Sequence, residues 1–563
     1  MGEYDVVVRG GIVVEATGTP RYKGDIGIKN GRIAKISGRI PAGSAREIDA
    51  GGCIVAPGAI NLHTHYDAQL NWDPYCTLDG WFGQTTITIG QCGFGFAPTR
   101  SADRDLNMRM MNRIEAIPLD SMMKGMRWDW ETYPEYLDSL DRQGLGVNVA
   151  SLLPFSPLRG YVLGMIAARQ NKAVTKEQLN RMKEIFRDGM RAGSFGFAAD
   201  MNAEDRCEDG SPIPSQVASD EEYLALAGVL GEFGVGCMGW TVGVSPNQSH
   251  QYELLTKMMQ LSGRPLHVVL GHEPGGPEWV KRMRAQGFPV APQKTPLFPQ
   301  NRFTLAEFNL FDYMPNWVDP FIGTAAERQK KLSNPKTRAA MKQDIVDMSA
   351  VYLGRTDWRT VRVLEVVHER NFQYEGKTIE TIAKMTGKHP VDVFIDLAID
   401  EDLQTEFGSR EFNVEAEKRI DEGLLDPYTH ISTSDGGAHV RFQANARWPV
   451  DFLAYWIRER EIMTLEQAHH KMSAYPAWIL GIPDRGSIRV GAFADLMVYN
   501  FNELGLENET PVYSNDFPGG ERRLVQKPKG MRYIIVNGGV TFENNQCSNQ
   551  LPGKLLRSYD MAH

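Results

Sequence analysis

The chain of 563 residues has few cysteines, and they are scattered. Only six occur, and no two of them form a CxxC pair. A disulfide framework or a zinc ribbon requires closely spaced cysteines. The distribution therefore argues against both and favours a reducing compartment.

Signals for a membrane or a nucleic-acid partner are also missing. No apolar run approaches the length of about 18 residues that a membrane span needs. The N-terminal stretch MGEYDVVVRGG alternates like a strand and lacks the apolar segment of a secretory signal. The formal net charge is −9, and no block of lysine and arginine stands out. We therefore expect a cytoplasmic protein that acts on a small molecule, with no nucleic-acid or membrane partner.

Short β-rich runs punctuated by glycine occupy both ends of the chain. They lie at residues 4–56, 486–500 and 530–543. The Asn-Gly pair at residues 30–31 favours a tight hairpin turn. We predict that residues 1–57 and 485–540 form one small domain, with 541–563 as a C-terminal tail.

The long middle of the chain alternates strand-like runs with amphipathic helices. Residues 147–153 form an apolar run, and residues 176–193 carry apolar side chains at three- and four-residue spacing. Residues 378–403 are typical of two helices broken at Pro390. Repeated strand-then-helix units indicate a parallel α/β architecture, and their number favours a closed barrel over residues 58–484.

Two histidines stand two residues apart in NLHTHYDAQLNWDPY, directly after an apolar run. Side chains alternate sides along a strand, so His63 and His65 would share one face and could offer a metal two ligands at once. The spacing alone fits two half-exposed loop histidines equally well. In a barrel, chemistry gathers at the carboxyl ends of strands, and these histidines lie at such an end.

Four motifs follow one another in an order that resembles a known family. They are PGAINLHTHYDAQLNWDP, GQTTITIGQCGFGFAP, STSDGGAHV and DRGSIRVGAFADLMVYN. In this order they resemble the amidohydrolase superfamily, in particular its N-acyl-D-amino-acid deacylase branch. The resemblance covers nearly the whole chain. It implies a distorted (β/α)8 TIM-like barrel with a small β-sandwich domain formed by both termini.

The resemblance implies a metal centre. His63 and His65 match histidines that hold a divalent metal through ring nitrogens. Asp435 matches an aspartate that contacts the metal and the attacking water and takes that water's proton. A carboxylate is basic enough for this step because a metal lowers the pKa of bound water to about 7. Without the resemblance, Asp435 is equally typical of an Asp-Gly-Gly turn.

Cys92 matches a metal-ligating cysteine of the deacylase branch, and a thiolate is a good zinc ligand. Outside that context, a lone cysteine here is typical of a small buried apolar residue. The family normally has asparagine where Gln91 stands. The ligand set predicts a divalent metal, zinc by preference, with one or two ions per chain.

The middle of the barrel departs from the family. The deacylases carry metal-ligating histidines near the ends of the fifth and sixth strands, but residues 235–243 contain none. Leu270 falls on the sixth-strand ligand position and leaves His267 and His272 out of register. These two histidines fit structural roles, and His272 is also a candidate for substrate binding. The resemblance therefore leaves a complete two-metal centre in question.

Other polar residues are candidates for the rim of the site. Arg159 could receive a substrate carboxylate as a two-pronged donor, or lie on the surface. His439 could orient substrate or stabilise an oxyanion, or make only a helix-start hydrogen bond. Asp67 could fix an imidazole or cap the next segment. His469 and His470 lie in a helical pattern and are predicted to be packing or surface residues.

The predicted function is that of a metal-dependent hydrolase. It would cleave the amide C–N bond of an N-acyl amino acid or a related small amide, aromatic ones included, with Asp435 as the base. Two alternatives stay open: an enzyme acting on an ester or on a C–C bond beside a carbonyl, and a non-catalytic binding or subunit-partner protein. An aromatic-rich segment at 128–140 is typical of core or subunit contact and leaves a homo-oligomer open.

Overall fold

The fold was analysed in a computed structural model. It describes residues 3–170, 173–243, 248–270, 275–298, 300–306, 310–348, 357–410 and 414–561. Within these residues, no helix combines the length and the apolar character that crossing a bilayer requires.

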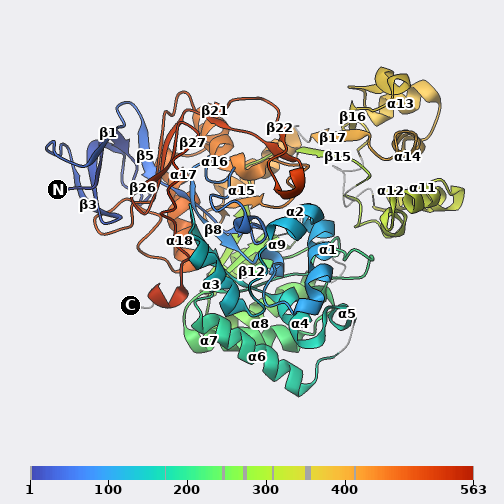
Figure 1. Ribbon diagram of the computed structural model, residues 1–563, viewed down its shortest axis with the longest axis horizontal. Helices are drawn as coiled ribbons and strands as arrows, with labels where there is room; N and C mark the ends of the chain where they lie inside the picture. The colour runs from blue at the N-terminus through green and yellow to red at the C-terminus, as the bar shows by residue number, and fades with distance from the viewer. Residues whose placement is uncertain are drawn as a thin grey trace.

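A series of short, buried parallel strands occupies the centre of the molecule (Figure 1). In chain order they are β6 (Ala59–Asn61), β7 (His63–Thr64), β8 (Gln84–Ile89), β9 (Asn148–Ser151), β10 (Leu153–Pro154), β11 (Gly196–Asp200), β12 (Cys237–Thr241), β13 (Leu266–Val269), β14 (Val290–Lys294), β18 (His430–Ile431) and β19 (Thr433–Gly436). Single residues separate β6 from β7, β9 from β10 and β18 from β19. Each of these pairs therefore continues one line of chain.

The pairing of these strands returns to its start. β6 pairs with β8 and β8 with β9, β10 to β14 pair in sequence, β14 pairs with β18, and β19 pairs with β7. All of these pairings are parallel. The carboxyl ends of the strands therefore meet at one end of a ring, which is the end where His63 and His65 stand.

Amphipathic helices cover the outside of this ring. They include α3 (Tyr133–Gln143), α6 (Lys176–Arg191), α7 (Asp220–Phe233), α8 (Gln248–Ser262) and α9 (Gly276–Ala285). The predicted helix at 176–193 is α6. Thr175 begins it with a capping box, and Met182, Phe186 and Met190 are buried. On β12, Met238 and Trp240 pack among the helices, so period-two alternation turns Gly239 and Thr241 to the inside.

Strands from both ends of the chain share one sheet. In spatial order it contains β27 (Gln546–Cys547), β26 (Gly539–Glu543), β25 (Met531–Val536), β20 (Leu496–Tyr499), β5 (Ile54–Pro57), β1 (Val6–Val13), β2 (Tyr22–Lys29) and β3 (Arg32–Ser37), with β4 (Arg46–Asp49) beside β1. Asn30 and Gly31 join β2 to β3 with positive φ at both positions, as the predicted tight turn requires. Figure 1 shows the blue and red strands side by side.

The predicted tail differs from the structure. β26 runs across residue 540 and β27 follows it, so the division at 541 cuts the sheet. Farther on, the backbone N–H of Leu556 donates to the Val149 carbonyl on β9. The last residues therefore pack against the ring, because their backbone completes the hydrogen bonding of a strand there.

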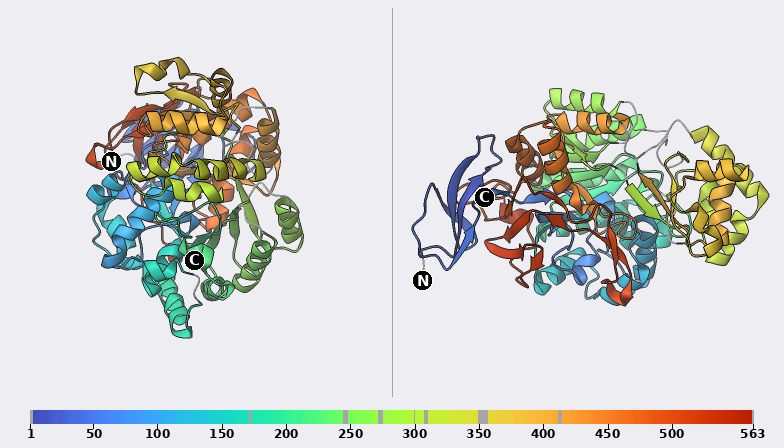
Figure 2. Two further views of the ribbon diagram at one scale, coloured as in Figure 1. Left: turned by 90° about the vertical axis from the view of Figure 1, so that its right-hand side faces the viewer. Right: turned by 90° about the horizontal axis from the view of Figure 1, so that it is seen from above.

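A separate substructure is inserted between β14 and β18. Its antiparallel sheet contains β15 (Gln300–Phe303), β17 (Glu406–Arg410) and β16 (Arg362–Glu365). Its helices include α11 (Ala325–Leu332), α12 (Pro335–Met348), α13 (Ile379–Thr386) and α14 (Pro390–Asp400). Phe303, Phe394 and Phe407 lie in one hydrophobic cluster, which also includes Ala116 and Phe442 from outside the insertion. Figure 2 shows it at the opposite end of the molecule from the N-terminal strands.

The insertion corrects one expectation. The break at Pro390 was predicted correctly, since α13 ends before it and α14 begins there. However, neither helix belongs to a strand-then-helix unit of the ring. Residues 58–484 therefore contain an inserted substructure that the helical pattern alone did not reveal.

Candidate metal centre

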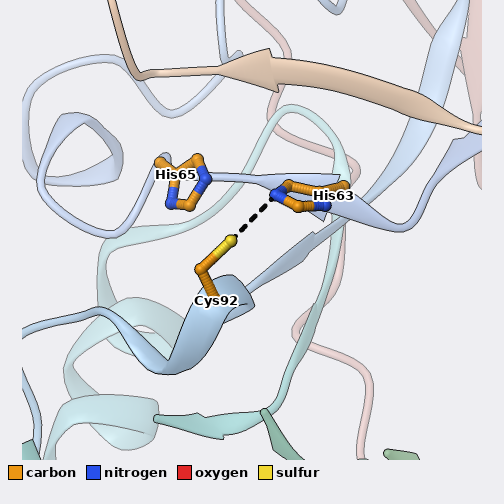
Figure 3. A group of neighbouring side chains, drawn as sticks. All are labelled: His63, His65 and Cys92. Atoms are coloured by element: carbon orange, nitrogen blue, oxygen red, sulfur yellow. Dashed lines mark hydrogen bonds between the residues drawn. The ribbon is translucent and has the colours of Figure 1, made fainter. Parts of the chain in front are cut away.

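Three ligand side chains come together at the carboxyl end of the first two ring strands. His63 lies on β7, His65 follows it, and Cys92 stands in the turn after β8. All three are buried, and their ligand atoms lie within 4.8 Å of one another. Figure 3 shows the two imidazoles and the sulfur converging, with the Cys92 Sγ 3.2 Å from the His63 Nε2. Two imidazoles and a thiol are a donor set that suits zinc.

Asp435 adds an oxygen to this group. It lies on β19, and its Oδ1 is 3.4 Å from the His63 Nε2. Its side chain is 36% exposed, whereas that of His63 is 5% exposed. The carboxylate therefore lies at the open side of the cluster, where it can contact both a bound ion and a solvent molecule.

Polar neighbours fix the orientation of His63. The Gln293 side-chain amide lies 3.0 Å from its Nδ1, and the Thr433 hydroxyl donates to the Gln293 oxygen at 2.8 Å. An amide can present either its nitrogen or its oxygen, so it can serve either tautomer of the ring. This contact turns the His63 Nε2 toward Cys92 and Asp435.

Three residues at or beside the cluster have an unusual backbone conformation, as do several residues elsewhere in the chain. Cys92, Asp435 and His439 have φ of 54°, 52° and 52°, which is the left-handed region that non-glycine residues seldom occupy. Such conformations cost about 1–3 kcal/mol each and tend to persist at functional sites. At these three positions, a backbone conformation that costs stability sets the direction of the side chain.

Burial prepares the donors for a cation. It lowers the pKa of His63 and, more strongly, that of His65, so both imidazoles are neutral near pH 7. Burial, together with the carboxylates of Asp200 and Glu115, raises the pKa of the Cys92 thiol well above its usual value. Burial also raises the pKa of Asp200 to about 7. A bound cation would offset the negative charge of these carboxylates and favour loss of the thiol proton. The residues present therefore fit a divalent metal.

Glu115 approaches the cluster from a helix. It is the last residue of α1 (Arg104–Glu115) and is buried. Its Oε1 lies 3.6 Å from the His65 Nδ1, and its Oε2 lies 3.5 Å from the His439 Nε2. Burial, with the charges of Asp205 and Asp435, raises its pKa well above the usual value.

Thr241 is the last residue of β12, the fifth ring strand, in a segment that contains no histidine. Its hydroxyl lies 3.3 Å from the Cys92 Sγ. On the sixth strand, β13, His267 is fully buried with its ring centroid 6.2 Å from that of His430. Burial lowers the pKa of His267 to about 3, so it is a neutral interior side chain. Leu270 follows β13, and His272 lies outside the described residues.

Arg159 does not join the cluster. Its guanidinium is fully buried on α4 (Phe155–Leu163), where its Nε donates to the Glu222 Oε2 at 2.8 Å. It also donates to the Ala168 carbonyl. Receiving a substrate carboxylate would require breaking this buried ion pair, so the expectation of a substrate contact is wrong for this arrangement.

Asp67, His469 and His470 have local partners. Asp67 Oδ1 accepts the Gly90 backbone N–H at 3.1 Å, which ties the strand-one loop to the turn that carries Cys92. His469 is buried with its Nε2 2.7 Å from the Tyr499 hydroxyl. His470 lies near the Ala16 carbonyl. This agrees with the packing roles expected of both histidines.

Glu115, Thr241 and Gln293 were missed by sequence reasoning. Thr241 and Gln293 lie at or next to the carboxyl ends of β12 and β14, so an exact strand assignment could have found them. Glu115 ends a surface helix with no motif around it, and no sequence signal singles it out.

Comparison with known proteins agrees with this arrangement. Residues 46–542 match the model of the amidohydrolase family. The chain belongs to that family.

Curated relatives are similar over nearly the full length. An uncharacterised protein of Mycobacterium tuberculosis is 26% identical over 585 residues, covering 97% of this chain and 93% of the relative. D-aminoacylase of Alcaligenes xylosoxydans xylosoxydans is 24% identical over 559 residues, covering 98% and 97%.

A solved structure has the same fold. N-acyl-D-glutamate deacylase from Bordetella bronchiseptica, complexed with zinc and a phosphonate mimic of the tetrahedral intermediate, matches with a TM-score of 0.66. The match has 22% identity and covers 98% of this chain and 99% of that one.

Proposed function

We propose that this chain is a metal-dependent hydrolase that cleaves the amide C–N bond of an N-acyl amino acid or a related small amide. The observation that carries the proposal is the convergence of His63, His65 and Cys92 with the carboxylate of Asp435 at one end of the ring. The names of two similar proteins, a D-aminoacylase and an N-acyl-D-glutamate deacylase, support this class of substrate.

The fold proposed for this function is a distorted (β/α)8 barrel with a β-sandwich domain from both termini. The closed cycle of parallel strand pairs supports the barrel. The sheet shared by residues 6–57 and 496–547 supports the two-ended domain. We place the barrel within residues 58–484, with the insertion between β14 and β18 as an addition to it.

The ligands proposed for the metal are His63, His65, Cys92 and Asp435. A bound zinc ion would supply Lewis acidity and lower the pKa of a water molecule toward 7. Asp435 accepts the proton of the attacking water and returns it to the leaving amide nitrogen. Its partial exposure suits this role, because the group must meet water and substrate in turn.

His439 is the proposed substrate contact near Asp435. Its side chain is 23% exposed, and the backbone N–H of His439 donates to the Glu115 carbonyl at 2.6 Å. A hollow beside Asp435 is lined by Gln69, Ser434 and Gln443 among others, although not by His439 or the three clustered ligand side chains. These polar groups can hydrogen-bond an amide or a carboxylate, which favours an amide of an amino acid over a wholly apolar one.

The test is metal content measured alongside a substrate screen. Purified protein should contain close to stoichiometric zinc, and it should hydrolyse at least one member of a panel of N-acyl-D- and N-acyl-L-amino acids and aryl amides. Zinc with turnover only on esters would favour the ester-cleaving alternative. Protein without bound metal and without turnover would favour a binding protein. A cytoplasmic location and a homo-oligomer stay predictions.

A further inference from the structure

The carboxylate of Glu115 lies between two imidazoles that belong to different parts of the site. His65 follows β7, and His439 follows β19, the strand that pairs with β7 and carries Asp435. Glu115 reaches both, with oxygen-to-nitrogen distances of 3.6 Å and 3.5 Å. Its backbone carbonyl also accepts the His439 N–H at 2.6 Å. The end of α1 thus connects the segment after β7 with the segment after β19, the strand that carries the proposed base.

Stability does not explain this carboxylate. A buried carboxylate is costly unless a strong partner compensates it, and apolar replacement is often neutral or stabilising. Arg113, two residues earlier on the same helix, shows the contrast. It pairs with Asp312 at 2.7 Å, and both side chains are 9% exposed, so that buried carboxylate has a permanent cation as its partner. Within the described residues, the ion pairs of Glu115 are with His65 and His439. Its environment is therefore suited to holding imidazoles.

The contact with His65 has a defined consequence for the ring. Its Nδ1 has no hydrogen-bond partner within 3.5 Å among the described residues, and Glu115 is the carboxylate that faces it. A hydrogen bond between these two atoms, which lie 3.6 Å apart, would need only a small shift of the carboxylate. The Nδ1 then carries the proton and the Nε2 is left as the donor to a metal, which is the arrangement that carboxylate partners impose on ligating histidines.

We propose that Glu115 is a positioning residue that acts through both histidines: it fixes the His65 ring for metal binding and holds the His439 ring beside Asp435. The inference rests on the proposed metal-dependent function. It assigns to one helix terminus the alignment of a metal ligand with a substrate contact.

Zinc release provides a test that needs no substrate. Zinc-loaded protein is mixed with excess chelator, and the rate of release is followed optically. Loss of a carboxylate partner of a ligating histidine typically weakens metal binding by about 10–100-fold. We expect Glu115→Gln, which keeps the size and replaces one of the two oxygens that face the imidazoles with an amide nitrogen, to release zinc at least about tenfold faster than the wild type.

Glu222→Gln is the matched control. Glu222 is as deeply buried, but it pairs with Arg159 and accepts the Ser219 backbone N–H. This variant should lose thermal stability while releasing zinc at the wild-type rate. If Glu115→Gln does not fold, Glu115→Asp is tested in its place. Because its carboxylate is shorter, this variant should still release zinc several-fold faster than the wild type.

Turnover separates the two contacts. His439→Asn should lower kcat or raise KM without changing zinc release. In the double variant His439→Asn/Glu115→Gln, kcat should fall by less than the product of the two single effects. Folded Glu115→Gln with wild-type zinc release would overturn the inference and leave the proposed function standing. A wild-type protein that binds no zinc would overturn both.

Discussion

Glu222 and Glu115 are two buried glutamates with very different partners. Glu222 faces the guanidinium of Arg159 at 2.8 Å, and both side chains are 0% exposed. Glu115 faces the imidazoles of His65 and His439 at 3.6 Å and 3.5 Å. A guanidinium is charged at every accessible pH and forms directed bonds, whereas an imidazole changes its charge near neutrality and can also ligate a metal.

The two glutamates also differ in location. The Arg159–Glu222 pair joins α4 to α7 among the outer helices of the ring. Glu115 lies at the carboxyl ends of the strands, next to His65. A buried carboxylate paired with a permanent cation thus has a structural role. A buried carboxylate such as Glu115, which among the described residues faces imidazoles and other acids, indicates a site suited to a cation.

Asp435 extends the comparison to a carboxylate that is open to solvent, and its variant should have the largest effect. Asp435→Asn keeps the size but removes the basicity, so kcat should fall by about 10²–10⁴-fold on the substrate found by the screen. The measurement is steady-state kinetics with zinc content determined for each preparation. His439→Asn serves as the comparison, and near-normal turnover of zinc-loaded Asp435→Asn would assign the base elsewhere.

Breaking the permanent pair should cost stability and leave the metal untouched. Arg159→Met strands the Glu222 carboxylate in the interior, which should lower the free energy of unfolding by about 3–5 kcal/mol. Denaturant unfolding measures this loss. The double variant Arg159→Met/Glu222→Leu should recover much of it, because both charges are gone. Reduced zinc content in folded Arg159→Met would contradict the separation of the two regions.

His469 adds a buried imidazole whose partner is neutral. Burial lowers its pKa to about 3, against about 6.5 in an unfolded chain. Between these values the unfolded state binds more protons, so stability falls as the pH falls from about 6.5 toward about 3. The contribution of His469 to the loss at pH 5 relative to pH 7.5 should be about 2 kcal/mol, in addition to that of other buried imidazoles such as His267.

The check on His469 is the pH dependence of unfolding. His469→Gln should reduce the loss of stability between pH 7.5 and pH 5 by about 2 kcal/mol, which is the share of His469. His250→Gln is the matched control, because the His250 side chain is 54% exposed and pairs with Asp220 on the surface. An unchanged pH dependence in His469→Gln would show that the buried imidazole is protonated without penalty.

Local sequence was sufficient for some of these features. His63 and His65 share a strand face because of their spacing, and Asn30-Gly31 makes its turn because both residues tolerate positive φ. Pro390 begins a helix because its missing N–H costs nothing at that position. Each of these depends on neighbours in the chain, so pattern reasoning could reach it.

Features that depend on distant partners could not be predicted in this way. Arg159 was a candidate substrate contact because the sequence does not show that Glu222, on another helix, forms an ion pair with its guanidinium. The helices around Pro390 belong to the insertion because β15 pairs with β17, a contact over more than a hundred residues. Glu115 meets His65 only once α1 has packed, so its role is visible only in three dimensions.

Thr241 gives the smallest and most specific test of the comparison, because its uncharged hydroxyl contacts Cys92, a proposed metal ligand. Its hydroxyl lies 3.3 Å from the Cys92 Sγ, and this contact lowers the pKa of the thiol against the opposing effect of burial. Thr241→Val keeps the shape and removes the hydrogen bond, which is worth about 0.5–1.5 kcal/mol. Zinc affinity should therefore fall by only about 2–10-fold, measured by competition with a chromophoric chelator. Thr241→Ser keeps the hydroxyl and should retain most of the affinity. A loss in Thr241→Val as large as that expected for Glu115→Gln would mean that the hydroxyl itself ligates the metal, and the fifth strand would then be part of the metal centre in this chain.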